Sequence, residues 1–112
     1  MLIIICVVFV VAAFFGSRLF DKVIKDENTY KPFAFVHGIL VGIGLVLLII
    51  YFSFTEDTSP LLPFGIFFIA GGFGSVMFVK DILERPIPKW LAYVHAVLAT
   101  TGLLILIFLA FL

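Results

Sequence analysis

The chain has 112 residues, of which 64% are hydrophobic and 12% are charged, and its mean hydropathy is +1.35. Soluble domains are roughly half apolar, so this composition excludes an ordinary soluble domain and indicates an integral membrane protein surrounded by a lipid bilayer. Seven basic and seven acidic residues give a formal net charge of zero. Because the basic residues form neither a free tail nor an amphipathic surface helix, no nucleic-acid partner is expected.

Four stretches of the chain lack Asp, Glu, Lys and Arg, and each is about long enough to cross a membrane. They are residues 1–17, 32–55, 58–79 and 90–112. A hydrocarbon core about 30 Å thick needs about 20 helical residues, whereas barrel strands would alternate apolar and polar residues. The sequence therefore predicts four membrane-spanning helices. We expect the first to be retained rather than removed as a signal peptide, because no basic residue precedes it.

The first and third helices are expected to extend beyond the membrane at one end. In residues 20–25 and 78–84, charged residues alternate with apolar ones without Gly or Pro. We expect the first helix to continue to Lys25, and the third to continue through Glu84 until Pro86 and Pro88 stop it.

Proline and serine mark the expected starts of two helices. Pro32 suits the first turn of the second helix, where its missing N–H costs no hydrogen bond. Ser59 is expected to cap the third helix, with Pro60 as its first helical residue.

The connections between the crossings differ in charge. All seven basic residues lie in residues 18–31 and 80–89. In the remaining connection, residues 53–60, the only charged residues are the acids Glu56 and Asp57. Basic connections are retained on the cytoplasmic side of a membrane. We therefore expect residues 18–31 and 80–89 in the cytoplasm and both termini outside, in a plasma or bacterial inner membrane.

The chain repeats with a gapless shift of 58 residues. Matched segments include Gly16-Ser17 with Gly74-Ser75, Val36-His37 with Val94-His95, and Gly44-Leu45 with Gly102-Leu103. Paired histidine, serine and glycine at one register indicate a tandem duplication of a helical hairpin, with repeats 1–54 and 59–112 inside a single domain, 1–112. Short connections make neighbouring helices antiparallel, so the predicted fold is an all-α, up-down-up-down four-transmembrane-helix bundle.

The repeat places one histidine on each of two diagonal helices. His37 and His95 should then lie at the same depth and face each other if both point inward. Two neutral imidazoles so placed are suitable axial ligands for the iron of a haem. Gly16 and Gly74, on the neighbouring helices, and Gly44 and Gly102, two turns after the histidines, would leave room for its flat ring.

The arrangement resembles the membrane b-type cytochromes, in which a four-helix bundle holds haem between histidines on its second and fourth helices. The resemblance covers the architecture of the whole chain and rests on His37, His95, Gly16 and Gly74. It implies one haem b, held by the single histidine pair, and a role in electron transfer. Basic residues at the cytoplasmic edge would neutralise the haem propionates, namely Lys31 and Lys89, or Arg18 and Lys22.

Other interpretations of the histidines and of the chain stay open. Each histidine also suits a packing role, with a hydrogen bond to a carbonyl, water or headgroup, and the pair suits proton handling. The chain is also of a size typical of small subunits or assembly partners of larger membrane complexes, or of a homo-oligomer. Small multidrug exporters are similar in length, but their first helix carries a glutamate, whereas the first acid here is Asp21. No nucleophile motif surrounds Ser17 or Ser75, so no catalytic activity of its own is expected.

Overall fold

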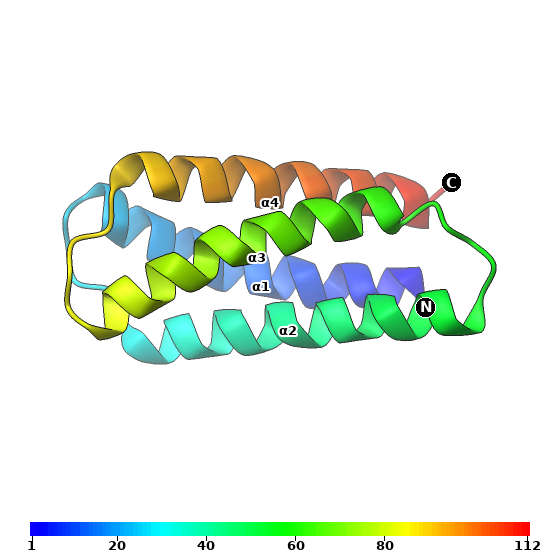
Figure 1. Cartoon of the computed structure of the whole chain (residues 1–112), viewed down its shortest axis with the longest axis horizontal. Coiled ribbons are helices and arrows are strands. Elements are labelled where there is room, and N and C mark those ends of the chain that lie inside the picture. The colour runs from blue at the N-terminus through cyan, green and yellow to red at the C-terminus, as the bar shows by residue number, and fades with distance from the viewer.

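The computed structural model describes all 112 residues, and they form four helices and no strand. The helices are α1 (Leu2–Ile24), α2 (Lys31–Phe54), α3 (Leu61–Ile82) and α4 (Lys89–Ala110). Each is long and apolar enough to span a membrane. The bundle measures 44 by 21 by 19 Å, with the helices along its long axis (Figure 1). The predicted all-α, four-helix membrane bundle is therefore confirmed.

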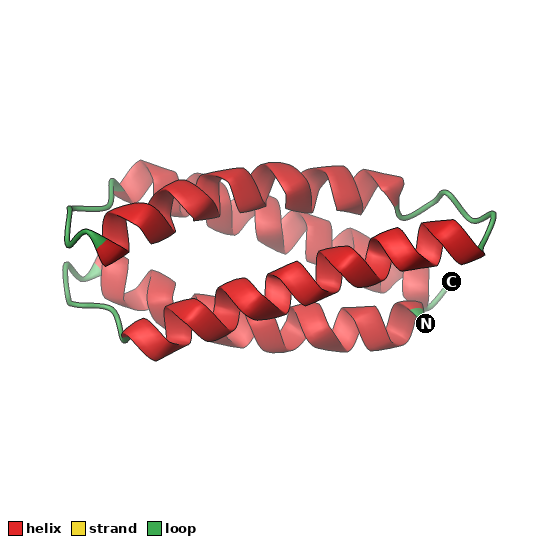
Figure 2. Cartoon of the chain, turned by 60° about the horizontal axis from the view of Figure 1, so that its bottom comes forward, coloured by secondary structure: helices red, strands yellow, loops and turns green.

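The four helices alternate in direction around the bundle. Both termini and the α2–α3 connection lie at one end, and the other two connections lie at the opposite end (Figure 1). α1 packs against α2 and α4, and α3 packs against the same two helices, whereas neither diagonal pair has a backbone contact. The turned view shows the four helices running side by side along the same axis (Figure 2). α2 and α4 are therefore diagonal partners, as the short connections predict.

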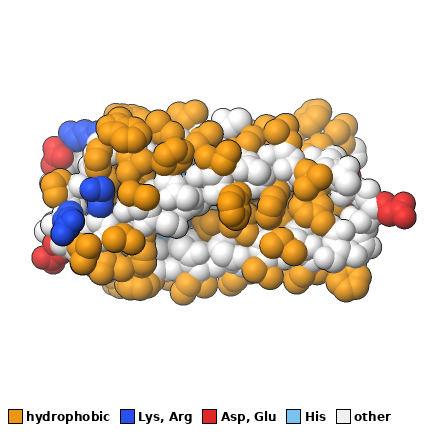
Figure 3. All heavy atoms as spheres, viewed as in Figure 1, with side chains coloured by type: hydrophobic (Ala, Val, Ile, Leu, Met, Phe, Trp, Pro, Cys, Tyr) orange, Lys and Arg blue, Asp and Glu red, His pale blue; other side chains and the backbone are white.

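The outside of the bundle is apolar along its length. Hydrophobic side chains cover the body of the molecule, and charged side chains gather at the two ends (Figure 3). Only 16 of the 112 residues are buried, and no buried residue is charged or polar. Such a surface suits hydrocarbon surroundings, because large apolar patches are rare on soluble monomers. The distribution fits an integral membrane protein.

Residues 58 positions apart occupy equivalent places in the two hairpins. Leu48 on α2 and Leu106 on α4 are both 0% exposed. Ala12 and its counterpart Ala70 are also both buried, and so are Ala34 and Ala92. The sequence repeat therefore coincides with a repeat in packing, which makes each contact in one hairpin comparable with its counterpart in the other.

α1 and α3 end in the same way: α1 runs to Ile24 with Lys25 as its C-cap, close to the expected end, whereas α3 ends two residues before the expected Glu84. Asp26 and Glu84 adopt left-handed backbone conformations, with φ of 55° and 56°. The amide of the following residue then bonds back to the helix, from Glu27 N to Lys22 O at 2.9 Å and from Arg85 N to Lys80 O at 2.8 Å. This closure is a Schellman motif. It ends α3 at Ile82, before the two prolines are reached.

The starts of α2 and α3 differ in how well the sequence predicts them. Pro32 lies in the first turn of α2, as predicted. The expected Ser59 cap is wrong, because Pro60 is the N-cap and α3 begins at Leu61 without a side-chain cap. The Ser59 amide instead donates to Asp57 Oδ1 at 3.0 Å. Ser59 therefore belongs to the turn around Asp57, and it lies before the first residue of α3.

Two ion pairs tie the hairpins together at the basic end. Lys31 at the start of α2 bonds the carboxylate of Asp81 at the end of α3, and Thr29 Oγ1 donates to the same carboxylate at 2.6 Å. Lys89 at the start of α4 bonds Asp26, just after α1, at 3.1 Å. The Asp81 side chain is 12% exposed, whereas that of Asp26 is 79% exposed. The first pair is therefore the more shielded of the two.

Candidate functional site

His37 on α2 and His95 on α4 meet across the diagonal of the bundle. Their ring centroids are 6.2 Å apart, and the ring planes make an angle of 81°. Both residues are half-buried. Each is the seventh residue of its helix, about 10 Å from the basic end of the bundle. The geometry matches the expected pair of imidazoles at one depth within a single chain.

A backbone carbonyl holds each ring. His37 Nδ1 lies 2.7 Å from Ala12 O on α1, and His95 Nδ1 lies 2.8 Å from Ala70 O on α3. A carbonyl oxygen only accepts, so each Nδ1 carries the proton and donates. In a neutral imidazole this leaves a lone pair on Nε2. Hydrogen bonds from the histidines to carbonyl oxygens agree with the packing interpretation. They also fix the tautomer that a metal ligand requires, with the proton on Nδ1 and the lone pair on Nε2.

Gly16 and Gly74 lie directly against the histidine rings. A Cβ on Gly16 would lie 2.8 Å from His37 Cε1, and a Cβ on Gly74 would lie 2.9 Å from His95 Cε1. Real Cβ atoms do not approach so closely, so any larger residue would displace the ring. Gly16 follows Ala12 by one helical turn. One turn of α1 therefore both makes room for the His37 ring and bonds it, and α3 does the same for His95.

Gly44 and Gly102 contact phenylalanine rings. A Cβ on Gly44 would lie 2.6 Å from Phe9 Cζ, and a Cβ on Gly102 would lie 3.0 Å from Phe67 Cε1. Phe9 and Phe67 stack on each other, with centroids 4.2 Å apart and an interplanar angle of 12°. This layer lies about 10 Å along the bundle from the histidines. The sequence interpretation missed this pair, although its 58-residue spacing was available as a signal. The assignment of Gly44 and Gly102 to a cofactor stays a prediction.

The basic residues expected to meet propionates already have protein partners. Lys31 bonds Asp81, Lys89 bonds Asp26, Lys22 bonds Glu27, and the Arg18 guanidinium lies 5.4 Å from the ring centroid of Phe14. An anion bound to any of the three lysines would compete with a carboxylate that is already in place.

No third side chain of a usual metal-ligating type joins the histidine pair. No group of three or more His, Cys, Asp or Glu residues comes together as a metal site anywhere in the chain. Metal–nitrogen bonds of about 2.0–2.1 Å place two imidazole centres about 6 Å apart when the rings bind opposite faces of one metal. The observed centroid separation of 6.2 Å is compatible with ligation of one metal centre and equally with an edge-to-face contact of the two rings.

Comparison with protein-family models found no match, and comparisons with curated proteins and with solved structures found none either.

Proposed function

We propose that this protein binds one b-type haem between His37 and His95 and acts as a small electron-transfer protein of the membrane. The observation that carries the proposal is the 6.2 Å separation of the two ring centroids across the bundle. Each ring also has its Nδ1 bonded to a carbonyl, which leaves Nε2 as the free donor.

The number of donors favours a haem over a bare metal ion. A structural zinc site usually takes four protein ligands, and a catalytic zinc site takes three. Here two histidines stand opposite each other, with no third ligand of the usual kinds. A haem carries its own nitrogen ligands and would need only two more donors from the protein, which His37 and His95 would supply. Two protein ligands are therefore enough for a haem, whereas a free zinc ion would need at least one more.

The protein groups around the histidines would act by orientation and by excluding water. The Ala12 and Ala70 carbonyls hold the ring planes and make the imidazoles better donors. Gly16 and Gly74 keep side chains of α1 and α3 away from the rings. When bound, haem supplies a one-electron iron couple. The apolar helices would surround the site with a medium of low dielectric constant.

The charge distribution supports one orientation for this site. All seven basic residues lie near the end at which α1 and α3 terminate, and the acidic connection lies at the other end. The positive-inside bias favours the basic end in the cytoplasm and both termini outside. The histidines, about 10 Å from that end, would then exchange electrons with a partner on the cytoplasmic side.

An absorption spectrum of the purified protein tests the proposal. Protein titrated with haemin in detergent should develop a Soret band and, after reduction, sharp visible bands. His37→Asn and His95→Asn should each abolish the reduced spectrum, because an asparagine amide can still donate to the Ala12 or Ala70 carbonyl but offers no Nε2. Thr101→Ala, at an exposed position of α4, is the control and should leave the spectrum unchanged.

The asparagine variants separate ligation from packing. If they fold and bind haemin as tightly as the unmodified protein, the histidines serve packing and the proposal fails. A folded unmodified protein that stays colourless with added haemin also overturns it, and favours a role as a non-catalytic subunit or assembly partner.

A further inference from the structure

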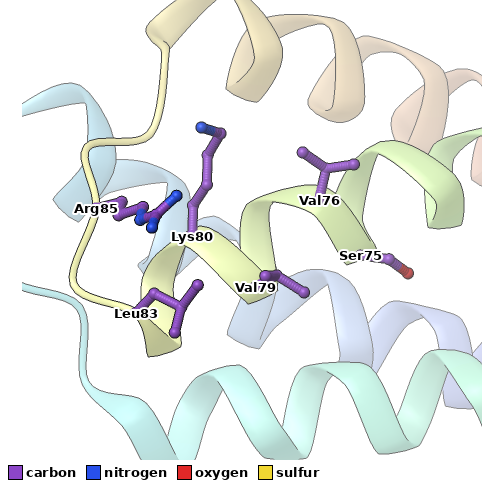
Figure 4. Close-up of a pocket in the computed structure, with 6 residues that line it drawn as sticks. All are labelled: Ser75, Val76, Val79, Lys80, Leu83 and Arg85. Carbon is purple, nitrogen blue, oxygen red and sulfur yellow. The ribbon is translucent and has the colours of Figure 1, made fainter.

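A groove opens on the outside of the bundle at the basic end of α3. It has a volume of about 400 Å³ and is lined by Ser75, Val76, Val79, Lys80, Leu83 and Arg85. In Figure 4, Lys80 projects from the last turns of α3, and Arg85 lies in the turn that follows the helix. The valines and Leu83 form the apolar part of the lining. The groove therefore combines two cations with an apolar floor.

The two cations of this groove have no carboxylate partner. Four lysines elsewhere form ion pairs, namely Lys22, Lys25, Lys31 and Lys89. Neither Lys80 nor Arg85 has a carboxylate oxygen within 4.0 Å. Two neighbouring cations without a counter-ion create a local positive potential that favours an anion.

The first hairpin shows what this surface looks like when its lysines are paired with carboxylates. The positions 58 residues earlier are Ser17, Arg18, Asp21, Lys22, Lys25 and Glu27. There Lys25 pairs with Asp21 at 3.3 Å, and Lys22 pairs with Glu27 at 3.6 Å. The second hairpin keeps the lysine, as Lys80, but has an arginine in place of the glutamate.

Apolar residues replace the other ion pair. Val79 and Leu83 stand where the first hairpin has Asp21 and Lys25. Val79 is 54% exposed, Leu83 is 56% exposed, and Val76, one turn before Lys80, is 49% exposed. Exposed aliphatic side chains on the outside of a membrane bundle contact hydrocarbon. In a bilayer, the groove would therefore face lipid tails at its Val76 end and the headgroup region at its Arg85 end.

We infer that this groove binds an anionic phospholipid. The lipid phosphate accepts hydrogen bonds from Lys80 and Arg85, and an acyl chain lies along Val76 and Val79. Arginine and lysine are common phosphate ligands, and basic pockets on the cytoplasmic side of membrane helices bind anionic headgroups. A free anion would use the two cations but would leave the apolar floor uncovered, so the phospholipid is the better match.

Lipid retention measured by native mass spectrometry tests the inference. Protein in detergent, titrated separately with phosphatidylglycerol and phosphatidylcholine of the same chains, should retain the anionic lipid at least tenfold more strongly. Lys80→Ala and Arg85→Ala should each weaken retention about fivefold, the size expected for one basic residue near an anionic headgroup. Arg85→Glu, which recreates the Lys22–Glu27 pairing of the first hairpin at Lys80, should weaken it more.

Lys22→Ala is the matched control, because Lys22 occupies the position equivalent to Lys80 and already pairs with Glu27. It should leave retention of phosphatidylglycerol unchanged. Equal retention of the two lipids, or an equal loss in Lys22→Ala and Lys80→Ala, overturns the inference. Displacement of the lipid by the same concentration of glycerol phosphate would show that the chains contribute nothing, and also overturns it. The groove contains neither histidine, so its test is independent of haem.

Discussion

Phe9 of α1 and Phe67 of α3 join the two hairpins at the centre of the bundle, although their helices have no backbone contact. The rings stack at 4.2 Å, and the two residues are 4% and 5% exposed. Each ring rests on a glycine of the next helix of its own hairpin, Gly44 or Gly102. The histidine pair bridges the other diagonal about 10 Å away. Two symmetric side-chain pairs therefore link opposite helices at two levels.

Replacing Gly44 by alanine should destabilise the bundle. The new Cβ would lie 2.6 Å from Phe9 Cζ, and the stacked Phe67 limits how far that ring can move. Overpacking of this kind costs about 1–3 kcal/mol. Unfolding in mixed micelles, followed by circular dichroism, measures the free energy of unfolding. Combining Gly44→Ala with Phe9→Leu should recover part of the loss.

Gly42→Ala is the control for this experiment, because a Cβ there meets no atom within 4 Å. Alanine favours helix over glycine by up to about 1 kcal/mol, so this variant should be as stable as the unmodified protein or more so. Equal stability of the Gly42 and Gly44 variants would contradict the proposed phenylalanine contact.

Replacing Gly16 by alanine should displace the His37 ring. The added Cβ would lie 2.8 Å from Cε1, and the shift should lengthen the bond from Nδ1 to Ala12 O. The ¹⁵N chemical shift of His37 Nδ1 reports this change with or without a ligand. If haem binds as proposed, affinity for haemin should fall about tenfold or more. Gly72→Ala, whose Cβ position is open, should change neither quantity.

Removing the Asp81 charge should weaken the basic end of the bundle more than removing that of Asp26. In Asp81→Asn, Lys31 and Thr29 lose a charged and shielded acceptor. This loss should lower the free energy of unfolding by about 1–2 kcal/mol. Asp26→Asn breaks an exposed pair and should change the free energy of unfolding by less than about 0.5 kcal/mol. The two variants, compared in the same unfolding assay, should differ in this order. The reverse order would refute the difference in shielding.

The hydrogen bond from Tyr51 should govern the titration of Asp57. Tyr51 donates its hydroxyl to Asp57 Oδ2 at 2.6 Å, and this bond, followed by those from Ser59, lowers the pKa of the carboxyl group. The folded pKa lies below the unfolded one, so the stabilising contribution is present above the unfolded pKa and is lost as pH falls through the folded value. Tyr51→Phe should raise the pKa of Asp57, measured by carboxyl ¹³C NMR. An unchanged pKa would show that the tyrosine bond does not form in solution.

Local patterns predicted the helices well and their ends less well. Uncharged runs of about 20 residues were sufficient for the four crossings, because hydrocarbon requires the backbone to form its hydrogen bonds within the segment. The end of α3 was misplaced, because a non-glycine residue, Glu84, takes the left-handed conformation that closes it. Ser59 does not cap α3, because the helix begins one residue later than expected, at Leu61, with Pro60 as its N-cap.

The sequence by itself determined four spanning helices, the repeat of 58 residues and the charge difference between the two ends. These properties depend on composition and spacing along the chain. Only the tertiary structure decided that Gly16 receives a histidine ring while Gly44 receives a phenylalanine ring, and that Lys80 and Arg85 have no counter-ion. Which side chains meet depends on how each helix is rotated against its neighbours, and nearly uniformly apolar helices carry little periodic signal to fix that rotation.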